Sequence, residues 1–380
     1  MPLPQPLAKS IMKKIIKQIT FLTIVVLLVA WSEPSDVILS AGLQPQITLD
    51  NSENVRIVYG RADSIFCLTS INKGETFSKP VLVGRINGMH LGMTRGPQLA
   101  SSSKYSVISG IDTLGNIHFF QLTHSTNQWE YKGRINDVPS SAPEGLMSIT
   151  ADTKDNFYAV WLDLRQNRRN NICFSSLSGE TGKWKKNELI YISPDGHVCE
   201  CCKPSIDVNG ANVAVMYRNW LNGSRDLYVI KSQNAGKSFQ EAQKLGLDTW
   251  KLVACPMDGG DIKVDNDGKV QTVWRREGLV YYCQPKEREI NIAKGKSCSI
   301  VSDNTNNKGL VIAMQEGENV KLVGQNNQNE INVGKGKFLK SAVLNNKEVL
   351  CVWEHNKSIR YRKIPTSSAN TALIKEWLRY

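Results

Sequence analysis

The feature that most constrains this chain is a two-stranded hairpin that recurs after residue 45. Each copy has an apolar run of strand length, a short polar loop and a second such run, and a turn containing Gly, Asn or Asp follows. Runs of this length that alternate between apolar and polar residues are typical of half-buried strands, and helical periodicity is almost absent. The copies occupy Val55–Leu68, Tyr105–Leu122, Phe157–Ser175, Val213–Ile230, Val270–Cys283, Leu310–Val323 and Val349–Arg362.

The spacing of these hairpins predicts the fold class. Their starts lie 39 to 57 residues apart, and a short strand-like run such as Gln46–Asp50 or Asp261–Val264 precedes each one. Four strands per repeat at this period are the signature of a β-propeller. We therefore expect an all-β fold over residues 33–365, a propeller of four-stranded blades, with seven blades by repeat count. A pair of β-sandwiches is the alternative, but sandwiches would not show so regular a period.

The last repeat lacks a fourth strand. The segment Asp36–Ser40 (DVILS) alternates in the same way and predicts an N-terminal strand that completes this blade. Such a strand would join the first and last parts of the ring and remove an exposed sheet edge.

The amino terminus has the pattern of an export signal. A basic stretch, Met12–Gln18, precedes twelve apolar residues, Ile19–Ala30, and Ala30-Trp31-Ser32 fits a cleavage site. This core is short for a spanning helix, so we expect a signal peptide over residues 1–32 and a secreted or periplasmic protein with no remaining membrane span. An uncleaved anchor is the alternative.

Residues 366–380 predict a short terminal helix.

Charge and composition exclude several partner classes. The 380 residues carry a formal net charge of +12, and removal of Lys9, Lys13, Lys14 and Lys17 with the signal lowers it to +8. The remaining basic residues are scattered and form no nucleic-acid-binding motif, so we expect no nucleic-acid partner. We expect a monomer without a cofactor.

Two turns resemble a known structural repeat. Ser70-Ile-Asn72-Lys-Gly74-Glu-Thr76-Phe77 and Ser232-Gln-Asn234-Ala-Gly236-Lys-Ser238-Phe239 are similar to the Asp-box (BNR) repeats of the sialidase superfamily, with Asn in place of the usual Asp. Ser178–Trp184 is a degenerate third copy. The resemblance implies a sialidase-like propeller, for which six blades are the alternative count. It also places these turns on the face opposite the active site.

The opposite face collects the candidate site. There, the loop between the second and third strands of a blade adjoins the loop that enters the next blade. Sialidases hold a sugar carboxylate with three arginines and use acidic residues in catalysis, because bidentate Arg–carboxylate pairing suits that group. The resemblance implies Arg95, Arg218 and Arg275 as the clamp, with Arg165 beside them, and Glu144 and Asp163 in proton transfer. The expected function is a glycoside hydrolase acting on an anionic or terminal sugar. A non-catalytic propeller that binds a glycan or protein is one alternative, and an exported protein that binds a metal through the cysteines described next is the other.

Four cysteines gather in two loops of that face. Cys199, Cys201 and Cys202 precede one blade, and Cys255 precedes the next. Export favours disulfides, with Cys255 paired to one of the other three, and a second bridge between neighbours in the first loop would leave no free thiol. A metal site for Cu(I) with Met257, or for zinc with His197, is the next interpretation, and redox-active thiols are the last.

Overall fold

The structure, a computed structural model, describes residues 36–301, 310–324, 330–345 and 348–364. The chain divides into two units, Met1–Val37 and Ile38–Tyr380, and only Asp36 and Val37 of the first are described. The predicted signal peptide and terminal helix lie outside the described residues. Within the described ranges there is no helix, and hence none long and apolar enough to cross a bilayer.

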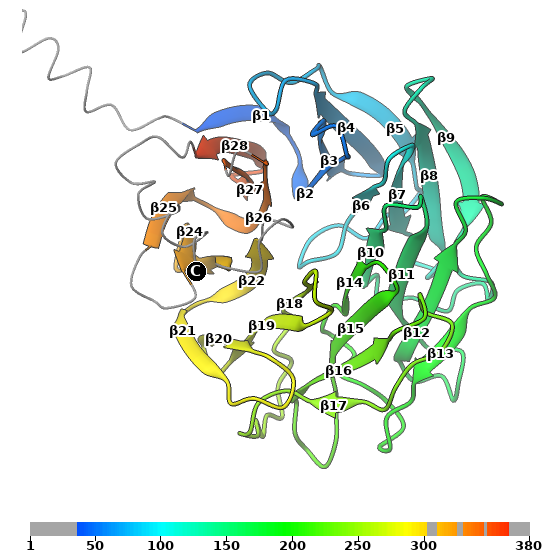
Figure 1. The fold of residues 1–380 in the computed structure, drawn as a ribbon, viewed down its shortest axis with the longest axis vertical. Coiled ribbons are helices and arrows are strands. Elements are labelled where there is room, and N and C mark those ends of the chain that lie inside the picture. Colours follow the sequence, from blue (N-terminus) through cyan, green and yellow to red (C-terminus); the bar gives the residue numbers. More distant parts are fainter. Residues whose placement is uncertain (1–35, 302–309, 325–329, 346–347, 365–380) are drawn as a thin grey trace, which may run out of the picture. The chain divides into compact units, whose positions relative to one another are not determined.

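Seven four-stranded antiparallel sheets form the blades (Figure 1). Blade 1 contains β2 (Leu43–Leu49), β3 (Val55–Arg61), β4 (Ser64–Ser70) and β5 (Val81–Arg85). Blade 2 contains β6 (Gln98–Ser101), β7 (Tyr105–Ile111), β8 (Ile117–Thr123) and β9 (Gln128–Arg134). Blade 3 contains β10 (Met147–Ala151), β11 (Phe157–Asp163), β12 (Asn171–Leu177) and β13 (Glu188–Tyr191). Blade 4 contains β14 (Ser205–Asn209), β15 (Asn212–Arg218), β16 (Leu227–Ser232) and β17 (Gln243–Lys244).

The other three blades follow the same order. Blade 5 contains β18 (Asp261–Val264), β19 (Val270–Arg276), β20 (Leu279–Cys283) and β21 (Ile290–Lys294). Blade 6 contains β22 (Lys296–Val301), β23 (Val311–Glu316), β24 (Asn319–Gly324) and β25 (Glu330–Lys335). Blade 7 contains β26 (Lys337–Val343), β27 (Val349–His355), β28 (Ser358–Ile364) and, as its outer strand, β1 (Val37–Ala41).

The ring is closed, as the repeat count predicts. Each inner strand contacts the inner strands of both neighbouring blades, and β26 of blade 7 contacts β2 of blade 1 (Figure 1). The strand order β1-β28-β27-β26 confirms that an N-terminal strand completes the last blade. The seven-bladed count is therefore confirmed, and the six-bladed alternative is wrong.

The hydrophobic core lies between the blades. Seven clusters of buried side chains each join two neighbouring blades. Trp161 of β11 packs with Phe119 of β8, and Leu350 of β27 packs with Ile57 of β3 across the closure. Both faces of each radial sheet are covered by a neighbouring blade, so β11 and β12 are buried along their whole length, which exceeds the single buried face that alternation indicates.

The two turns singled out in the sequence share one geometry. Ser70 Oγ accepts a hydrogen bond from the Gly74 N–H (2.9 Å), and Asn72 Oδ1 accepts one from the Thr76 N–H (3.0 Å). The second turn repeats both bonds, at 3.0 Å each, between Ser232 and Gly236 and between Asn234 and Ser238. Gly74 and Gly236 have φ values of 82° and 75°, a conformation that glycine adopts without steric cost.

The aromatic residue after each turn packs on the preceding blade. Phe77 lies edge-on to Tyr361, and Phe239 lies edge-on to Phe174, with ring centroids 4.8 and 5.0 Å apart. The segment Ser178–Trp184 differs, because Gly182 donates to the Ser178 carbonyl rather than to a side chain.

Candidate functional site

One face of the ring is built by loops that pair with each other. The N–H of Leu164, after β11, donates to the Ser141 carbonyl in the loop that enters blade 3 (2.8 Å). The N–H of Cys199, in the loop that enters blade 4, likewise donates to the Arg218 carbonyl at the end of β15 (3.0 Å). The predicted face is therefore present, and we call it the loop face.

A polar channel runs between the inner strands. Its cavity has a volume of about 570 Å³ and is lined by residues of all seven inner strands or the loops that lead into them. Unlike the spaces between the blades, this channel is lined mainly by polar side chains. Those with charge are Asp152, Lys203, Asp207, Asp261, Lys263 and Lys340.

Lys203 is the chemically distinctive residue of this channel. It comes directly before Pro204 and β14, and its ammonium donates to Gln98 Oε1 at the start of β6 (3.0 Å). Burial and, to a smaller extent, the nearby Lys340 ammonium lower the pKa of Lys203 to about 7, while the Asp261 carboxylate acts in the opposite direction. Lys340, in β26, lines the same cavity. Two lysines for which no close ion pair with a carboxylate is found among the described residues thus lie beside one open cavity, with Asp261 as the carboxylate that acts on Lys203.

The other charges of the channel are compensated. Lys263 lies 3.2 Å from Asp207 Oδ1, and that carboxylate also accepts the Val264 N–H (2.8 Å). Asp207 raises the pKa of Lys263, whereas burial raises the pKa of Asp207. Asp261 accepts the N–H groups of Ile262 and Ile300. These groups hold neighbouring inner strands together, and Asp261 is also the carboxylate that acts on Lys203.

Asp163 is buried and saturated with hydrogen bonds. Its side chain is 0% exposed and accepts bonds from Ser141 Oγ (2.7 Å) and Trp161 Nε1 (2.8 Å). Arg165 adds its backbone N–H, Nε and Nη2, at 2.9, 2.8 and 3.0 Å. No lone pair of Asp163 faces solvent, an arrangement that argues against its predicted role in proton transfer. Arg165, which also pairs with Asp137 (3.0 Å), shapes the loop and is not free to bind substrate.

We expect Asp163→Asn to lower the free energy of unfolding by about 1–3 kcal/mol, because the amide accepts fewer of the five donors. Ligand binding at the channel should be unchanged, since Asp163 is enclosed. Chemical denaturation and ligand titration of the same preparation check this. If the variant keeps native stability but loses ligand binding, Asp163 takes part in the binding site.

Arg218 is likewise a structural residue. It is 1% exposed, and its guanidinium donates to the backbone carbonyls of Asp258, Arg225 and Arg275. The indole of Trp250 lies 5.3 Å from its Cζ atom. The predicted clamp of Arg95, Arg218 and Arg275 is therefore corrected, because a guanidinium enclosed by three carbonyls cannot accept an anion. The Nε of Arg275 is buried and has no hydrogen-bond partner.

Arg95 and Glu144 form a small group of their own. The Nη2 of Arg95 lies 3.3 Å from Glu144 Oε2, with the side chains 17% and 34% exposed. His90 lies against Gly145, and its Nε2 is buried without a partner. Burial lowers the pKa of His90, and the Arg95 charge lowers it further, so the ring is neutral at pH 7. Glu144 thus stays a candidate, since it is the predicted carboxylate that solvent reaches.

Three cysteine sulfurs meet on the loop face. The Sγ atoms of Cys199, Cys201 and Cys202 lie within 4.8 Å of one another, and Cys199 is 3.6 Å from each of the other two. Contacts with Cys201 and Cys202, together with the Arg225 guanidinium, lower the pKa of the Cys199 thiol. The same thiol contacts raise the pKa of Cys201.

The expected disulfides are absent. All nine cysteines are free thiols, and Cys255 is exposed and outside the group of three. His197 is outside it too, because its Nδ1 bonds to the Val198 carbonyl and its ring stacks on Trp220. Met257 is half-buried in the loop of Cys255. The loop of Cys199–Cys202 brings its own three sulfurs together without a partner from the next loop.

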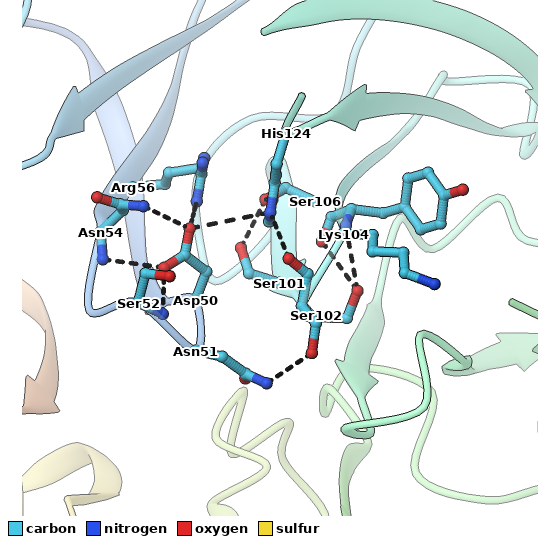
Figure 2. A network of polar contacts seen from close by, with 12 residues as sticks. Asp50, Asn51, Ser52, Asn54, Arg56, Ser101, Ser102, Lys104, Ser106 and His124 are labelled. Carbon is cyan, nitrogen blue, oxygen red and sulfur yellow. Dashed lines mark hydrogen bonds and ion pairs between the residues drawn. The ribbon is translucent and has the colours of Figure 1, made fainter. Parts of the chain in front are cut away.

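A Ser–His–Asp row lies between blades 1 and 2, at the opposite ends of the inner strands (Figure 2). Ser106 Oγ is 2.9 Å from His124 Nε2, and Asp50 Oδ2 is 3.9 Å from Nδ1. However, Nδ1 also lies 3.0 Å from the Ser103 carbonyl, Asp50 is paired with Arg56 (2.8 Å), and Ser106 is fully buried. This network joins the two blades. Ser106 is enclosed, whereas Arg56 and His124 also line a neighbouring cavity of about 520 Å³.

Sequence reasoning missed Lys203, Lys340, Gln98 and Arg225. Lys203 comes just before β14, Gln98 begins β6 and Lys340 lies in the middle of β26, and the blade topology brings these distant residues to one cavity. A lysine before the Pro204 that precedes an inner strand was the available signal. Nothing in the sequence indicates that Arg225 approaches Cys199.

Comparisons with known proteins agree with this fold. No protein-family model and no curated protein matches the chain. Among solved structures, a BP39L lectin from Burkholderia pseudomallei has a TM-score of 0.63 at 10% identity, covering 87% of this chain and 98% of the lectin. An ulvan lyase of polysaccharide lyase family PL25 has a TM-score of 0.55 at 10% identity, covering 90% and 100%. An α-L-arabinanase from Penicillium chrysogenum has a TM-score of 0.51 at 14% identity, covering 79% and 98%. The chain is therefore similar in fold to these structures.

Proposed function

We propose that this protein binds an anionic carbohydrate at the end of the central channel on the loop face. The observation that carries the proposal is the pair Lys203 and Lys340, two lysines beside an open polar cavity, with no close ion pair to a carboxylate found for either among the described residues. The pKa of Lys203 is lowered to about 7, so an anion bound there would favour its ammonium form. Burial of an uncompensated cation is unfavourable unless an anion joins it. A sugar carboxylate or sulfate would supply that charge, and Gln98 offers an amide for a neighbouring hydroxyl.

Two other observations support a carbohydrate as the ligand: the size and lining of the cavity, and the ligands of structures with a similar fold. The cavity of about 570 Å³ has room for a mono- or disaccharide, and polar side chains of several inner strands surround it. The structures similar in fold include a lectin, an α-L-arabinanase complexed with arabinobiose and an ulvan lyase bound to a glucuronate–sulfated rhamnose unit. The last of these ligands has both anionic groups that the two lysines would select.

The test is a binding titration with an oligogalacturonate, a sulfated heparin oligosaccharide, sialyllactose and neutral maltohexaose. We expect an anionic ligand to bind and maltohexaose not to bind. Lys340→Met and Lys203→Met should each weaken binding about tenfold or more, because each loses a charged hydrogen bond. Lys183→Met, an exposed lysine away from the channel, is the matched control. Equal binding of the neutral sugar, or unchanged affinity in both channel variants, would contradict the proposal.

Hydrolysis of such a sugar is the second candidate function. It is favoured by Glu144, a solvent-accessible carboxylate held by Arg95 on the loop face. The assay is turnover of fluorogenic α-sialosides and uronides, with Glu144→Gln as the variant that should abolish it. Binding without turnover across this panel would support a non-catalytic glycan-binding propeller.

Two further assignments belong to this proposal. The turns at Ser70–Phe77 and Ser232–Phe239 are Asp-box repeats of the sialidase superfamily, supported by their identical hydrogen bonds. The protein is exported, which the basic-then-apolar pattern of residues 12–30 supports and amino-terminal sequencing of the mature protein would test.

A further inference from the structure

We propose that Cys199, Cys201 and Cys202 form a three-sulfur site for Cu(I). The three sulfurs belong to one short loop and lie within 4.8 Å of one another, a property that the binding of a carbohydrate does not require. The site lies on the loop face, and its ligands and chemistry are separate from those of the channel.

The sulfur spacing fits a bound metal better than a disulfide. A metal–sulfur distance of about 2.3 Å places the three sulfurs of a trigonal site about 4 Å apart. The observed separations of 3.6 Å, within a group no wider than 4.8 Å, bracket that value. A disulfide needs sulfurs about 2.05 Å apart, and all three thiols are free.

The donor set selects the metal. Thiolates are soft ligands and favour Cu(I), whereas a structural zinc site closes with four ligands. Within the described residues no histidine, cysteine or carboxylate joins the three sulfurs as a fourth ligand. Cys255 is exposed, and His197 is turned to its own loop backbone and to Trp220.

A positively charged side chain lies beside the three sulfurs and would offset the negative charge of a thiolate complex. Three thiolates and one Cu(I) ion carry a net charge of −2, after the thiols release their protons to solvent. Arg225 donates from Nη1 to Cys199 Sγ (2.9 Å), and its position is fixed by a bond from Nε to the Leu252 carbonyl (3.1 Å). The ring of Trp220 lies 4.6 Å below its Cζ atom. Such a cation beside the sulfurs offsets the negative charge of a buried thiolate complex.

The test uses the full chain, reduced and titrated anaerobically with Cu(I) against a chromogenic Cu(I) chelator. We expect one tightly held ion per chain, and X-ray absorption should show three sulfur neighbours. Cys199→Ser, Cys201→Ser and Cys202→Ser should each abolish stoichiometric binding, while Cys255→Ser retains it. Cys201 is the least buried of the three, so its variant tests the site even where the others disturb the loop. Arg225→Gln should weaken the affinity about tenfold to a hundredfold.

Three results would overturn the proposal. They are a disulfide between any two of these cysteines in the native protein, preferential retention of Zn(II) in the presence of Cu(I), and Cu(I) binding that is equal in the wild type and in the Cys201→Ser variant.

Discussion

Arg218→Met should lower the free energy of unfolding by about 3–5 kcal/mol, the largest stability loss that we expect from one substitution here. Arg218 is 1% exposed, and its guanidinium donates to the carbonyls of Asp258 (3.0 and 3.2 Å), Arg225 (2.7 Å) and Arg275 (2.8 Å). Methionine fills part of the volume but donates no hydrogen bond. Three buried carbonyls from blade 4, blade 5 and the loop between them would then lose their partner.

The measurement is urea unfolding followed by tryptophan fluorescence, since Trp250 packs on this guanidinium. Arg218→Lys should recover only part of the loss, because one ammonium cannot reach three carbonyls in the plane of a guanidinium. Arg169→Met is the control, an arginine with a 49% exposed side chain for which we expect a change below about 0.5 kcal/mol. A loss below about 1 kcal/mol in Arg218→Met would show that water or neighbouring groups replace these bonds.

Affinity for an anionic sugar should fall as the pH rises above 7, by up to about tenfold per pH unit. Burial lowers the pKa of Lys203 to about 7, so its ammonium is lost over a range where carboxylates and sulfates of a ligand stay ionised. A bound anion stabilises the ammonium, and the complex therefore takes up a proton near neutral pH. Titrations at pH 6, 7, 8 and 9, with calorimetry in buffers of different ionisation enthalpy, measure both effects.

The ammonium of Lys203 also makes the free energy of unfolding depend on pH, and the sign of that dependence is known. Lys203 has a lower pKa in the folded state than in the unfolded chain, so between about pH 7 and 10.5 the unfolded state binds more protons. This group therefore makes stability rise with pH across that interval. In Lys203→Met both the rise in stability and the steep pH dependence of binding should disappear. A wild-type affinity that does not change from pH 6 to 9 would mean that Lys203 does not contact the ligand.

The fold could be predicted from the sequence to the level of strand pairing. Both faces of each blade are buried, so each strand keeps its apolar positions, and the recurring hairpins reveal the period. The closing strand was predictable because Asp36–Ser40 alternates and the last repeat lacks one strand. Predicted features outside the described residues stay predictions.

The site was less predictable, because charge in a sequence does not tell what a side chain faces. Asp163 and Arg218 are on the expected face, but five donors and three carbonyls enclose them. Lys203 and Lys340, by contrast, line one cavity although they are 137 positions apart in the sequence, because the closed ring of blades brings their strands together. Nor could residue spacing show that Cys199–Cys202 group their sulfurs without Cys255, because this depends on the path of one loop.

The pairing of β1 with β28 sets an order of events during synthesis. β1 is made first, but its strand partner begins at Ser358, more than 300 residues later. Until then β1 lacks its sheet and has its contacts with blade 1, where Ser40 Oγ accepts a hydrogen bond from the Tyr59 hydroxyl (2.7 Å). The nascent chain therefore keeps an open ring in which one face of blade 1 and one face of blade 6 lack their neighbour, leaving apolar side chains such as Ile57 and Val333 uncovered. Blade 7 is therefore the last blade to form. A chain whose translation stops before β28 is the most prone to aggregate.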